Sequence, residues 1–504
     1  MSEREHLETD VVIVGAGNAA MSAAISASEH GARALVLEKS PEKHKGGNST
    51  YTHGSIRFAY EGIEDIKEVV PDLTEEEERT TDFGSYPDEQ FFEDMCRLTD
   101  YRTDPELASL LTSESLATMK WLHSHNVRFV PIYGRQAFKV DGFFKFWGGM
   151  VLESVGGGYG LVDTLHKKAE KLGTKVLFQA MATELLYDDE GVHGVVFKHK
   201  GKTKEVHAKS VILASGGFHA NKEMRTRYLG PGWDLAKTRG SRYNTGDGIR
   251  MALDIGAAST GNWSGAHSVG GDMNAPEFAE GFQKLSYPFG VIVNAEGKRF
   301  VDEGADFRNY TYAKYGRRIL EQPGQFAWQI FDQKVTGLLR EEYKIRQVTK
   351  VTANTLQELA EKLVGVDAEA FMKTVDEYNQ AVRKDVPFHP NIKDGRCTEG
   401  LEVPKSNWAN TLDEGPFEAY QVTCGITFTY GGLEINTETE VQDILGQSIP
   451  GLYAAGELVG GLFYFNYPGG AGLMAGSVFG RIAGRNAAEF VEKVENGQLN
   501  QVNH

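Results

Sequence analysis

One segment, residues 10–38, constrains the fold of this chain more than any other. Val11–Val14 is a continuous apolar run, the pattern of a strand that is buried on both faces. The run leads into Gly15-x-Gly17-x-x-Ala20. In such a turn Gly15 permits a sharp reversal, Gly17 lets the backbone approach a pyrophosphate, and Ala20 lets the next helix pack close to the strand.

The residues after this turn complete a strand–helix–strand unit. Residues 21–30 read as the helix, and Gly31 is its C-terminal stop. Residues 35–37 form a second buried strand that ends at Glu38, about 20 residues beyond the glycines, where an acid accepts hydrogen bonds from ribose hydroxyls. The spacing therefore predicts a dinucleotide-binding unit, and the alternative is a fortuitous glycine turn.

Chain length and net charge set broad limits. A chain of 504 residues is too long for one core, so we expect two or three lobes. The net charge of -17 argues against nucleic-acid binding. An anionic substrate would therefore need a local basic pocket.

The cysteines and the apolar segments bear on the compartment in which the protein is expected. Cys96, Cys397 and Cys424 have no CxxC spacing, so we expect no metal site and no disulfide framework. No apolar stretch reaches membrane-spanning length, and the first six residues show no signal peptide. We expect a cytoplasmic protein without an integral membrane segment, and peripheral docking to a membrane partner stays open.

Nucleotide-binding patterns lie at both ends of the chain and looser sequence lies between them. We expect a helix over 104–126 and strands over 175–188 and 191–198. A buried strand over 210–213 runs into Gly216-Gly217, and a strand over 449–454 ends in Gly456-Glu457. The chain is thus predicted to form an α/β, nucleotide-binding domain split in sequence (1–256 and 412–504), with an inserted α+β capping domain (257–411).

Together these motifs resemble the fumarate reductase/succinate dehydrogenase flavoprotein superfamily over nearly the whole chain. The segments that carry the resemblance are Gly15-x-Gly17-x-x-Ala20 with Glu38, Gly46-Gly-Asn-Ser49, Ala214-Ser-Gly-Gly-Phe218, Thr245-Gly-Asp-Gly248, Gly297-Lys-Arg-Phe-Val-Asp-Glu303 and Gly451-Leu-Tyr-Ala-Ala-Gly-Glu457. The resemblance implies a Rossmann-like (GR2-type) domain that binds FAD rather than NAD.

The resemblance also implies which residues hold the cofactor. They are Gly15, Gly17, Asn18, Ala19, Ala20, Glu38, Lys39, Gly46, Gly47, Asn48, Ser49, Ala182, Ala214, Gly216, Gly217, Gly246, Asp247, Gly456, Glu457, Gly472 and Leu473. Relatives that tether FAD use a histidine in the loop after the second strand. Asn48 occupies that place and His53 follows five residues later, so we expect non-covalent FAD.

Segments 304–316 and 327–332 resemble the tricarballylate dehydrogenases. Members of the superfamily interconvert a C–C and a C=C bond beside an electron-withdrawing group, with a hydride moving through flavin N5 and a proton through a protein group.

The resemblance also assigns roles to two residues of the cap. Arg308 matches, with a one-residue offset, the arginine that moves the proton, and Glu303 or Asp306 would return it. The alternative for Arg308 is a salt bridge in the cap. His267 matches a cap histidine that grips a substrate carboxylate, and a structural role is equally open.

Two departures from the fumarate reductase pattern concern the substrate. The family's His-Thr-x-Gly-Gly becomes Phe428-Thr-Tyr-Gly-Gly, and an arginine before the late Gly-Gly becomes Tyr467. Both lost residues bind a dicarboxylate, so fumarate is an unexpected substrate. The Tyr-Pro-Gly sequence also resembles ketosteroid dehydrogenases, in which a tyrosine polarises a ketone. Tyr464 and Tyr467 would do so here, or would pack against the flavin ring.

Three basic residues and three functions are left open. Arg57 faces either a substrate anion or the pyrophosphate, and Arg135 and Lys139 are expected on a solvated surface.

The first candidate function is an FAD enzyme that acts on a small molecule such as a polycarboxylate, with an unidentified electron donor or acceptor. The second is a ketosteroid-dehydrogenase-like or ene-reductase enzyme with a neutral carbonyl substrate. The third is a flavoprotein without catalytic activity. The sequence identifies neither the substrate nor the reaction direction nor the oligomeric state.

Overall fold

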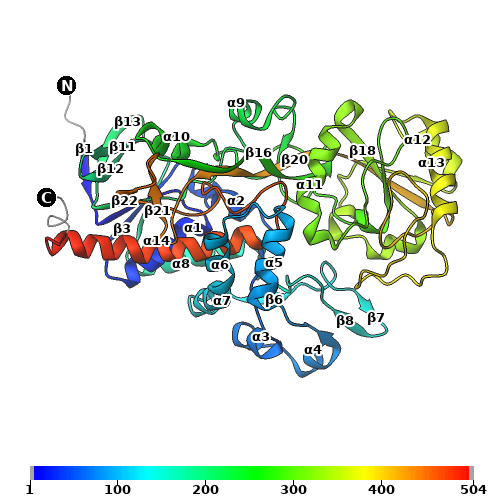
Figure 1. Ribbon diagram of the computed structural model, residues 1–504, viewed down its shortest axis with the longest axis horizontal. Coiled ribbons are helices and arrows are strands. Elements are labelled where there is room, and N and C mark those ends of the chain that lie inside the picture. Colours follow the sequence, from blue (N-terminus) through cyan, green and yellow to red (C-terminus); the bar gives the residue numbers. More distant parts are fainter. Residues whose placement is uncertain (1–4, 499–504) are drawn as a thin grey trace.

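The computed structural model describes residues 5–498, so four of the first six residues, in which no signal peptide is expected, lie outside the described residues. The molecule is elongated, with the first described strand and the end of the C-terminal helix at one extremity and the segment around residues 340–400 at the other (Figure 1). Among the described residues, no helix is both long enough and apolar enough to cross a membrane.

A six-stranded sheet forms the core of the nucleotide-binding lobe. Its order is β10 (Lys175–Phe178), β3 (Ala34–Glu38), β2 (Val11–Val14), β14 (Ser210–Leu213), β22 (Ser448–Ala454) and β21 (Glu440–Gln442). The first five strands are parallel and β21 is antiparallel. Strands from the first half of the chain thus pair directly with β22 near its end, as expected for an α/β domain that is split in sequence.

Two helices of this lobe pack against each other more closely than ordinary side chains would allow. Helix α1 (Asn18–Glu29) lies along α14 (Ala471–Glu495), as the blue and red helices of Figure 1 show. A Cβ atom at Gly480 would lie 2.4 Å from the carbonyl oxygen of Ala19, and one at Gly484 would lie 2.2 Å from that of Ala23. Glycines in α14 therefore set the spacing that holds its N-terminus beside the glycine-rich turn.

Two elements differ from the sequence prediction. The expected strand over 175–188 is two strands, because Gln179 has φ +56° and turns the chain from β10 into β11 (Ala180–Asp188). The expected helix over 104–126 is also divided, into α6 (Pro105–Ser113) and α7 (Ser115–Ser124).

The second sheet has the order β1 (Glu5–Glu8), β13 (Lys202–His207), β12 (Gly191–His199) and β11.

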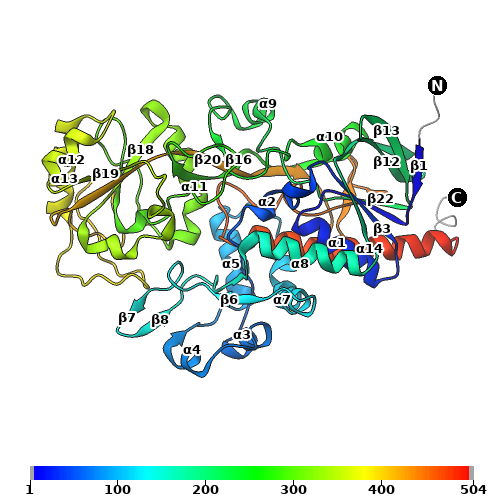
Figure 2. The same ribbon diagram turned by 180° about the vertical axis from the view of Figure 1, so that it is seen from behind.

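A third sheet extends away from the nucleotide-binding lobe. It is built on the long strand β20 (Phe417–Leu433), which pairs with β15 (Lys237–Thr238), β16 (Ser259–Asp272), β18 (Phe326–Phe331) and β19 (Lys350–Ala353). Strand β17 (Val291–Val293) completes it beside β18. Helices α11 (Tyr312–Leu320), α12 (Leu356–Lys362) and α13 (Ala368–Ala381) lie along it (Figure 2). Strands β16 to β19 and the three helices fall within the predicted cap of 257–411, whereas β15 and the central strand β20 lie outside it. The limits of the cap remain predictions.

Shorter elements lie between these sheets and helices in the sequence. Among them are α2 (Gly47–Thr50), β4 (Ser55–Ile56), α3 (Ile63–Val69), α4 (Glu75–Thr80), β5 (Thr81–Asp82), α5 (Asp88–Leu98), β6 (Phe129–Pro131), β7 (Lys139–Val140), β8 (Phe143–Lys145), β9 (Leu152–Ser154), α8 (Gly157–Lys171), α9 (Lys222–Met224), α10 (Asp247–Asp254) and the 3-10 turns η4 (Arg308–Tyr310) and η7 (Glu341–Tyr343).

Candidate active site

A single long cavity runs from the glycine-rich turn to the cap. Its volume is about 1770 Å³, including the part that is open to solvent. The predicted cofactor residues line it with three exceptions, Ala20, Gly217 and Gly246. Ala20 is fully buried, a Cβ at Gly217 would meet Thr429, and Gly246 precedes α10 with φ +80°. These three residues therefore lie behind the residues that line the cavity.

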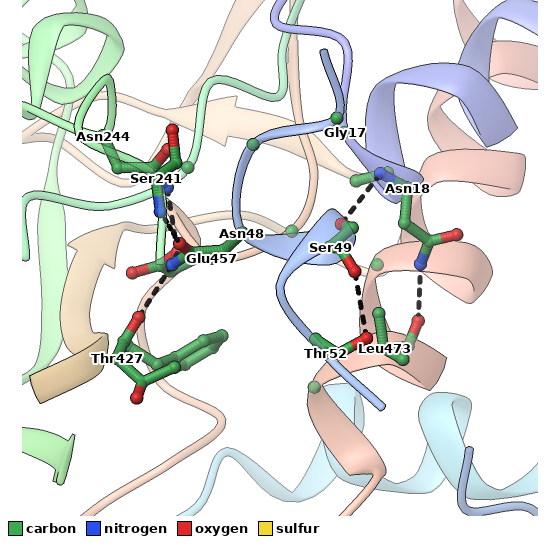
Figure 3. A pocket seen from close by; sticks show the side chains of 18 of the residues that line it. Gly17, Asn18, Asn48, Ser49, Thr52, Ser241, Asn244, Thr427, Glu457 and Leu473 are labelled. Carbon is green, nitrogen blue, oxygen red and sulfur yellow. Dashed lines mark hydrogen bonds between the residues drawn. The ribbon is translucent and has the colours of Figure 1, made fainter. Parts of the chain in front are cut away.

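The glycine-rich turn is fixed by contacts that leave no room for a larger residue. Gly15 has φ +107°, and a Cβ there would lie 2.3 Å from the carbonyl oxygen of Ala214. The backbone N–H of Asn18 donates to Ser49 Oγ at 3.0 Å, and its side-chain amide donates to the carbonyl of Leu473 at 2.8 Å (Figure 3). Helix α1 therefore begins at Asn18, three residues before the predicted start, and its first turn faces the cavity.

The acid that ends the second strand has the surroundings of a nucleotide-binding residue. Glu38 is buried, and its carboxylate accepts a hydrogen bond from the backbone N–H of Ser40 at 2.6 Å. Burial raises its pKa above the ordinary value. Lys39 beside it donates to Asp247 at 2.7 Å, so this lysine is held by the chain itself.

Asn48 connects four segments of the cavity wall. Its amide nitrogen donates to the carbonyl of Thr427 at 2.7 Å and to Glu457 Oε2 at 3.2 Å, and its amide oxygen accepts from the backbone N–H of Ser241 at 3.0 Å (Figure 3). Glu457 also accepts from the backbone N–H of Thr429 at 3.0 Å. The Gly-Glu pair at the end of β22 is thereby fixed in position.

These residues fit an FAD molecule. The turn at Gly15 and Gly17 leaves backbone free to approach phosphates, and the wall holds an acid for the ribose. The hydroxyl of Ser215 is buried, lines the cavity and has no hydrogen-bond partner among the described residues. Such a donor is satisfied by a polar ligand.

The cap end of the cavity is basic. Four arginines line it: Arg135, Arg239, Arg308 and Arg340. Arg239 pairs with Glu280 at 3.0 Å, Arg340 pairs with Glu342 at 3.0 Å, and Arg135 pairs with Glu153. None of these three glutamates is among the residues that line the cavity. The surface offered to a ligand is therefore cationic, because the balancing carboxylates lie behind the arginines.

Arg308 lies among other arginines rather than beside the predicted carboxylates. Its side chain is 6% exposed and donates to the carbonyl of Arg135. Burial, together with the charge of Arg340, lowers its pKa to about 9. The two predicted proton-return residues contact other arginines instead: Glu303 pairs with Arg299 at 2.5 Å and Asp306 with Arg97 at 2.9 Å. Their role in returning a proton to Arg308 stays a prediction that no contact supports.

His267, Tyr312, Phe428 and Tyr467 form an uncharged aromatic group on the cavity wall. The ring of His267 lies 5.0 Å from those of both Tyr312 and Tyr467, edge to face. Burial lowers the pKa of His267 to about 3, so the imidazole is neutral at ordinary pH. The two tyrosine hydroxyls lie 2.7 Å apart, and Phe428 stacks on Tyr467 at 6.2 Å.

Three other expectations are corrected. Tyr464 does not line the cavity, because its hydroxyl lies beside Thr260. Arg57 faces neither a substrate nor a pyrophosphate; it is fully buried and donates to the carbonyl of Gly469 at 2.8 Å and to Tyr86 at 2.9 Å. Arg135 lies in the cavity wall rather than on a solvated surface, whereas Lys139 is exposed as expected.

Arg239, Arg340 and His53 also line the cavity. No local motif pointed to the two arginines, and His53 was considered only as a possible tether for FAD. Tertiary folding brings the three residues to the same cavity. A separate group of three side chains of types that can ligate a metal, His6, Glu205 and His207, lies on β1 and β13 with donor atoms within 4.8 Å of one another. None of the three is among the residues that line the cavity.

Comparison with known proteins agrees with this geometry. A family described as FAD binding domain matches residues 10–473. A probable fumarate reductase of Shewanella frigidimarina is 32% identical, covering 95% of this chain and 75% of its own length. The open conformation of a flavocytochrome c3 fumarate reductase matches with a TM-score of 0.72 and 28% identity, over 96% of this chain and 79% of that one.

A 3-ketosteroid-Δ4-(5α)-dehydrogenase from Rhodococcus jostii matches with a TM-score of 0.73 and 25% identity, over 97% of this chain and 98% of its own. The family match covers most of the chain and confirms the predicted FAD-binding α/β fold. The protein belongs to the FAD binding domain family and, within it, to the fumarate reductase/succinate dehydrogenase flavoprotein superfamily of FAD-dependent oxidoreductases.

Proposed function

We propose that the protein interconverts a CH–CH and a C=C bond beside an electron-withdrawing group, on a small polycarboxylate like the substrate of the tricarballylate dehydrogenases. The names of similar proteins, a fumarate reductase and a ketosteroid dehydrogenase, support this class of reaction. FAD bound in the cavity supplies the hydride chemistry. The substrate lies between it and the cap.

The basic cap end of the cavity carries the proposal. Arg135, Arg308 and Arg340 face the ligand space, and arginine forks bind carboxylates in a bidentate manner. Arg135 and Arg340 each pair with a glutamate behind the wall, whereas Arg308 has no ion pair among the described residues. Burial and the nearby charge of Arg340 lower the pKa of both Arg135 and Arg308. A substrate carboxylate would stabilise the charged form of Arg308.

Arg308 is the proposed proton donor and acceptor. Arginine is ordinarily charged at all physiological pH values. Here burial and neighbouring arginines lower its pKa to about 9, close enough to neutrality for the guanidine to exchange a proton. His267 and Tyr467 would hold the other end of the substrate.

A second candidate is the oxidation or reduction of a neutral carbonyl compound. Its support is the Tyr312–Tyr467 pair, in which the bond between the two hydroxyls uses one proton and leaves the other for a ligand. A hydroxyl that donates a hydrogen bond to the carbonyl oxygen of the substrate stabilises the enolate charge that develops there. The arginines make this candidate the weaker of the two.

The finer properties of the site are also proposals. Non-covalent FAD is supported by Asn48, which has no nucleophilic atom, and by the engagement of His53 with Glu342 at 3.0 Å. A cytoplasmic location and an unidentified electron donor or acceptor complete the proposal. A non-catalytic flavoprotein would have no need of the buried, mutually repelling arginines.

The test is a substrate panel on the FAD-loaded protein. Tricarballylate is offered with an artificial electron acceptor, cis-aconitate with an artificial donor, and the corresponding amides and a steroid enone serve as neutral comparisons. We expect turnover on the carboxylates and at least 100-fold less on the amides. Turnover on the enone without turnover on any carboxylate would support the second candidate instead.

A further inference from the structure

Two histidines and a glutamate of the second sheet converge on one carboxylate oxygen. Nδ1 of His6 lies 3.5 Å from Oε2 of Glu205, and Nε2 of His207 lies 3.6 Å from the same oxygen. The centroids of the two imidazole rings are 5.5 Å apart. Two ring nitrogens and a carboxylate oxygen are therefore gathered at one place on the sheet.

The pairing of two strands brings these side chains together. Strand β1 runs parallel to β13, with His6 directly beside Glu205 in the register. Glu205 and His207 are two residues apart on β13, so their side chains point to the same face of the sheet. The ring of His193, on β12, stacks against that of His207 with 6.4 Å between centroids. The group is thus positioned by backbone pairing and ring packing rather than by a loop.

The donor atoms suit a zinc ion. Zn²⁺ binds imidazole nitrogen and carboxylate oxygen at about 2.0–2.2 Å, so two ligands of a tetrahedral site lie about 3.3–3.6 Å apart. The separations of 3.5 and 3.6 Å agree with this spacing. Three protein ligands leave the fourth position for water. Mg²⁺ and Ca²⁺ prefer oxygen ligands, so two imidazoles favour zinc over either of them.

The exposure of the three side chains allows an ion to reach them. His6 is 53% exposed and His207 is 44% exposed, whereas Glu205 between them is 15% exposed. Strands β1 and β13 lie together at one extremity of the molecule (Figure 1). Because none of the three residues lines the cavity, an ion bound here would have a structural role rather than a catalytic one.

A metal ion at this position would cross-link a short strand to its neighbour. Strand β1 has four residues and stands at the end of its sheet, where β13 is its partner. The backbone N–H of Thr9 then donates to the carbonyl of His207 at 3.1 Å, and the chain continues into β2 and the glycine-rich turn. The group therefore lies beside the segment that leads into the cofactor site.

We propose that His6, Glu205 and His207 bind one Zn²⁺ ion, which fastens β1 to β13. Zinc is held by Nδ1 of His6, Nε2 of His207 and the Glu205 carboxylate, and any proton on these atoms passes to solvent as the ion binds. No electron moves. The expectation of no metal site rested on cysteine spacing, and these three residues form no local motif because β1 and β13 are far apart in sequence. The site does not depend on the proposed function.

Calorimetric titration of the FAD-loaded full chain with Zn²⁺, after bound metal has been removed by a chelator, tests the site. We expect one ion per chain and no binding of Ca²⁺ under the same conditions. His6→Gln and His207→Gln should each weaken zinc binding at least about 100-fold, because even residues that only support a ligand contribute 10- to 100-fold. His30→Gln is the matched control, since His30 is an exposed histidine at the end of α1, and it should bind zinc as wild type does.

Amide hydrogen exchange tests whether the ion fastens the strand. If β1 must release zinc in order to open, zinc at ten times its Kd should slow exchange of the β1 amides about tenfold by mass action. His6→Gln should show no such slowing. Exchange in α13, in the cap region, should be the same with and without zinc.

Different results would overturn different parts of the proposal. Wild-type protein that binds no zinc, or variants that both keep wild-type affinity, would show that these residues are not a zinc site. Zinc binding that both variants lose, with unchanged exchange of β1 in wild type, would overturn the fastening. The FAD content and circular dichroism of each variant check its fold. Since the two histidines lie on different strands, misfolding of one variant leaves the other to decide.

Discussion

The hydroxyl oxygens of Tyr312 and Tyr467 lie 2.7 Å apart. Tyr312 belongs to helix α11 of the cap region, and Tyr467 lies in the loop that leads into α14 of the nucleotide-binding lobe. One hydroxyl must donate to the other, so the pair keeps a single free proton. The bond joins the two regions beside the substrate space, where both residues line the cavity.

Removing the Tyr467 hydroxyl should therefore affect turnover. We expect Tyr467→Phe to lower kcat/KM on the best substrate about fivefold, equivalent to about 1 kcal/mol for one hydrogen bond. Tyr464→Phe is the matched control, since Tyr464 does not line the cavity. Steady-state kinetics of both variants check this, and equal losses would contradict the assigned positions.

Fumarate should be a poor substrate. Phe428 presents no hydrogen-bond donor, and it stacks on Tyr467 where fumarate reductases place charged or polar groups. Wild-type enzyme with a strong artificial donor should reduce fumarate negligibly. A rate comparable with that of the best substrate would show that these positions do not exclude it. Phe428→His with Tyr467→Arg should add dicarboxylate affinity, although the rate need not follow.

The cofactor should leave the protein when it is denatured by acid. Asn48 holds the place of a tethering histidine, so the supernatant should be yellow and the pellet colourless. Glu38→Ala should weaken FAD binding by about 1.5–3 kcal/mol, or about 13- to 160-fold, by removing a charged acceptor for the ribose. Glu190→Ala, an exposed acid in the β11–β12 turn, is the control. Equal FAD affinity in both variants would remove Glu38 from the site.

The stability of the protein should depend on pH through His166. Its Nε2 donates to the carbonyl of Ala16 in the glycine-rich turn at 3.0 Å, and burial lowers its pKa to about 4. Because the unfolded state binds the proton more readily, stability falls as pH drops below about 6.5, with a loss of about 2 kcal/mol by pH 5. Denaturant unfolding of His166→Gln should show a loss smaller by that amount. An identical pH dependence would contradict the buried, neutral histidine.

Local patterns predicted the nucleotide-binding part of the fold well. The run Val11–Val14 and the glycines after it depend on neighbours in sequence, so the strand and its turn were visible without tertiary information. The division at Gln179 was not, because φ +56° at a glutamine has no sequence signal. The same holds for the break at Glu114 between α6 and α7.

The cap end of the cavity was harder to predict for the same reason. Arg340 and His53 lie far apart in sequence, and both pair with Glu342 in the folded chain. A sequence motif pointed to Arg308. The two carboxylates close to it in sequence, Glu303 and Asp306, pair with Arg299 and Arg97 rather than with Arg308. Motifs identify single residues, and the charges around them depend on the folded chain.

The central claim is that Arg308 exchanges the proton, and one comparison tests it most directly. The turnover of Arg308→Ala and Arg308→Lys is measured on the best carboxylate substrate, with the ratio of flavin to protein absorbance recorded for each. We predict a loss of about 10²–10⁴ in kcat for Arg308→Ala with normal FAD content. Arg308→Lys keeps the charge but loses the planar fork, so it should also be impaired. Near wild-type turnover in Arg308→Ala, or a loss explained by missing FAD, would contradict the account.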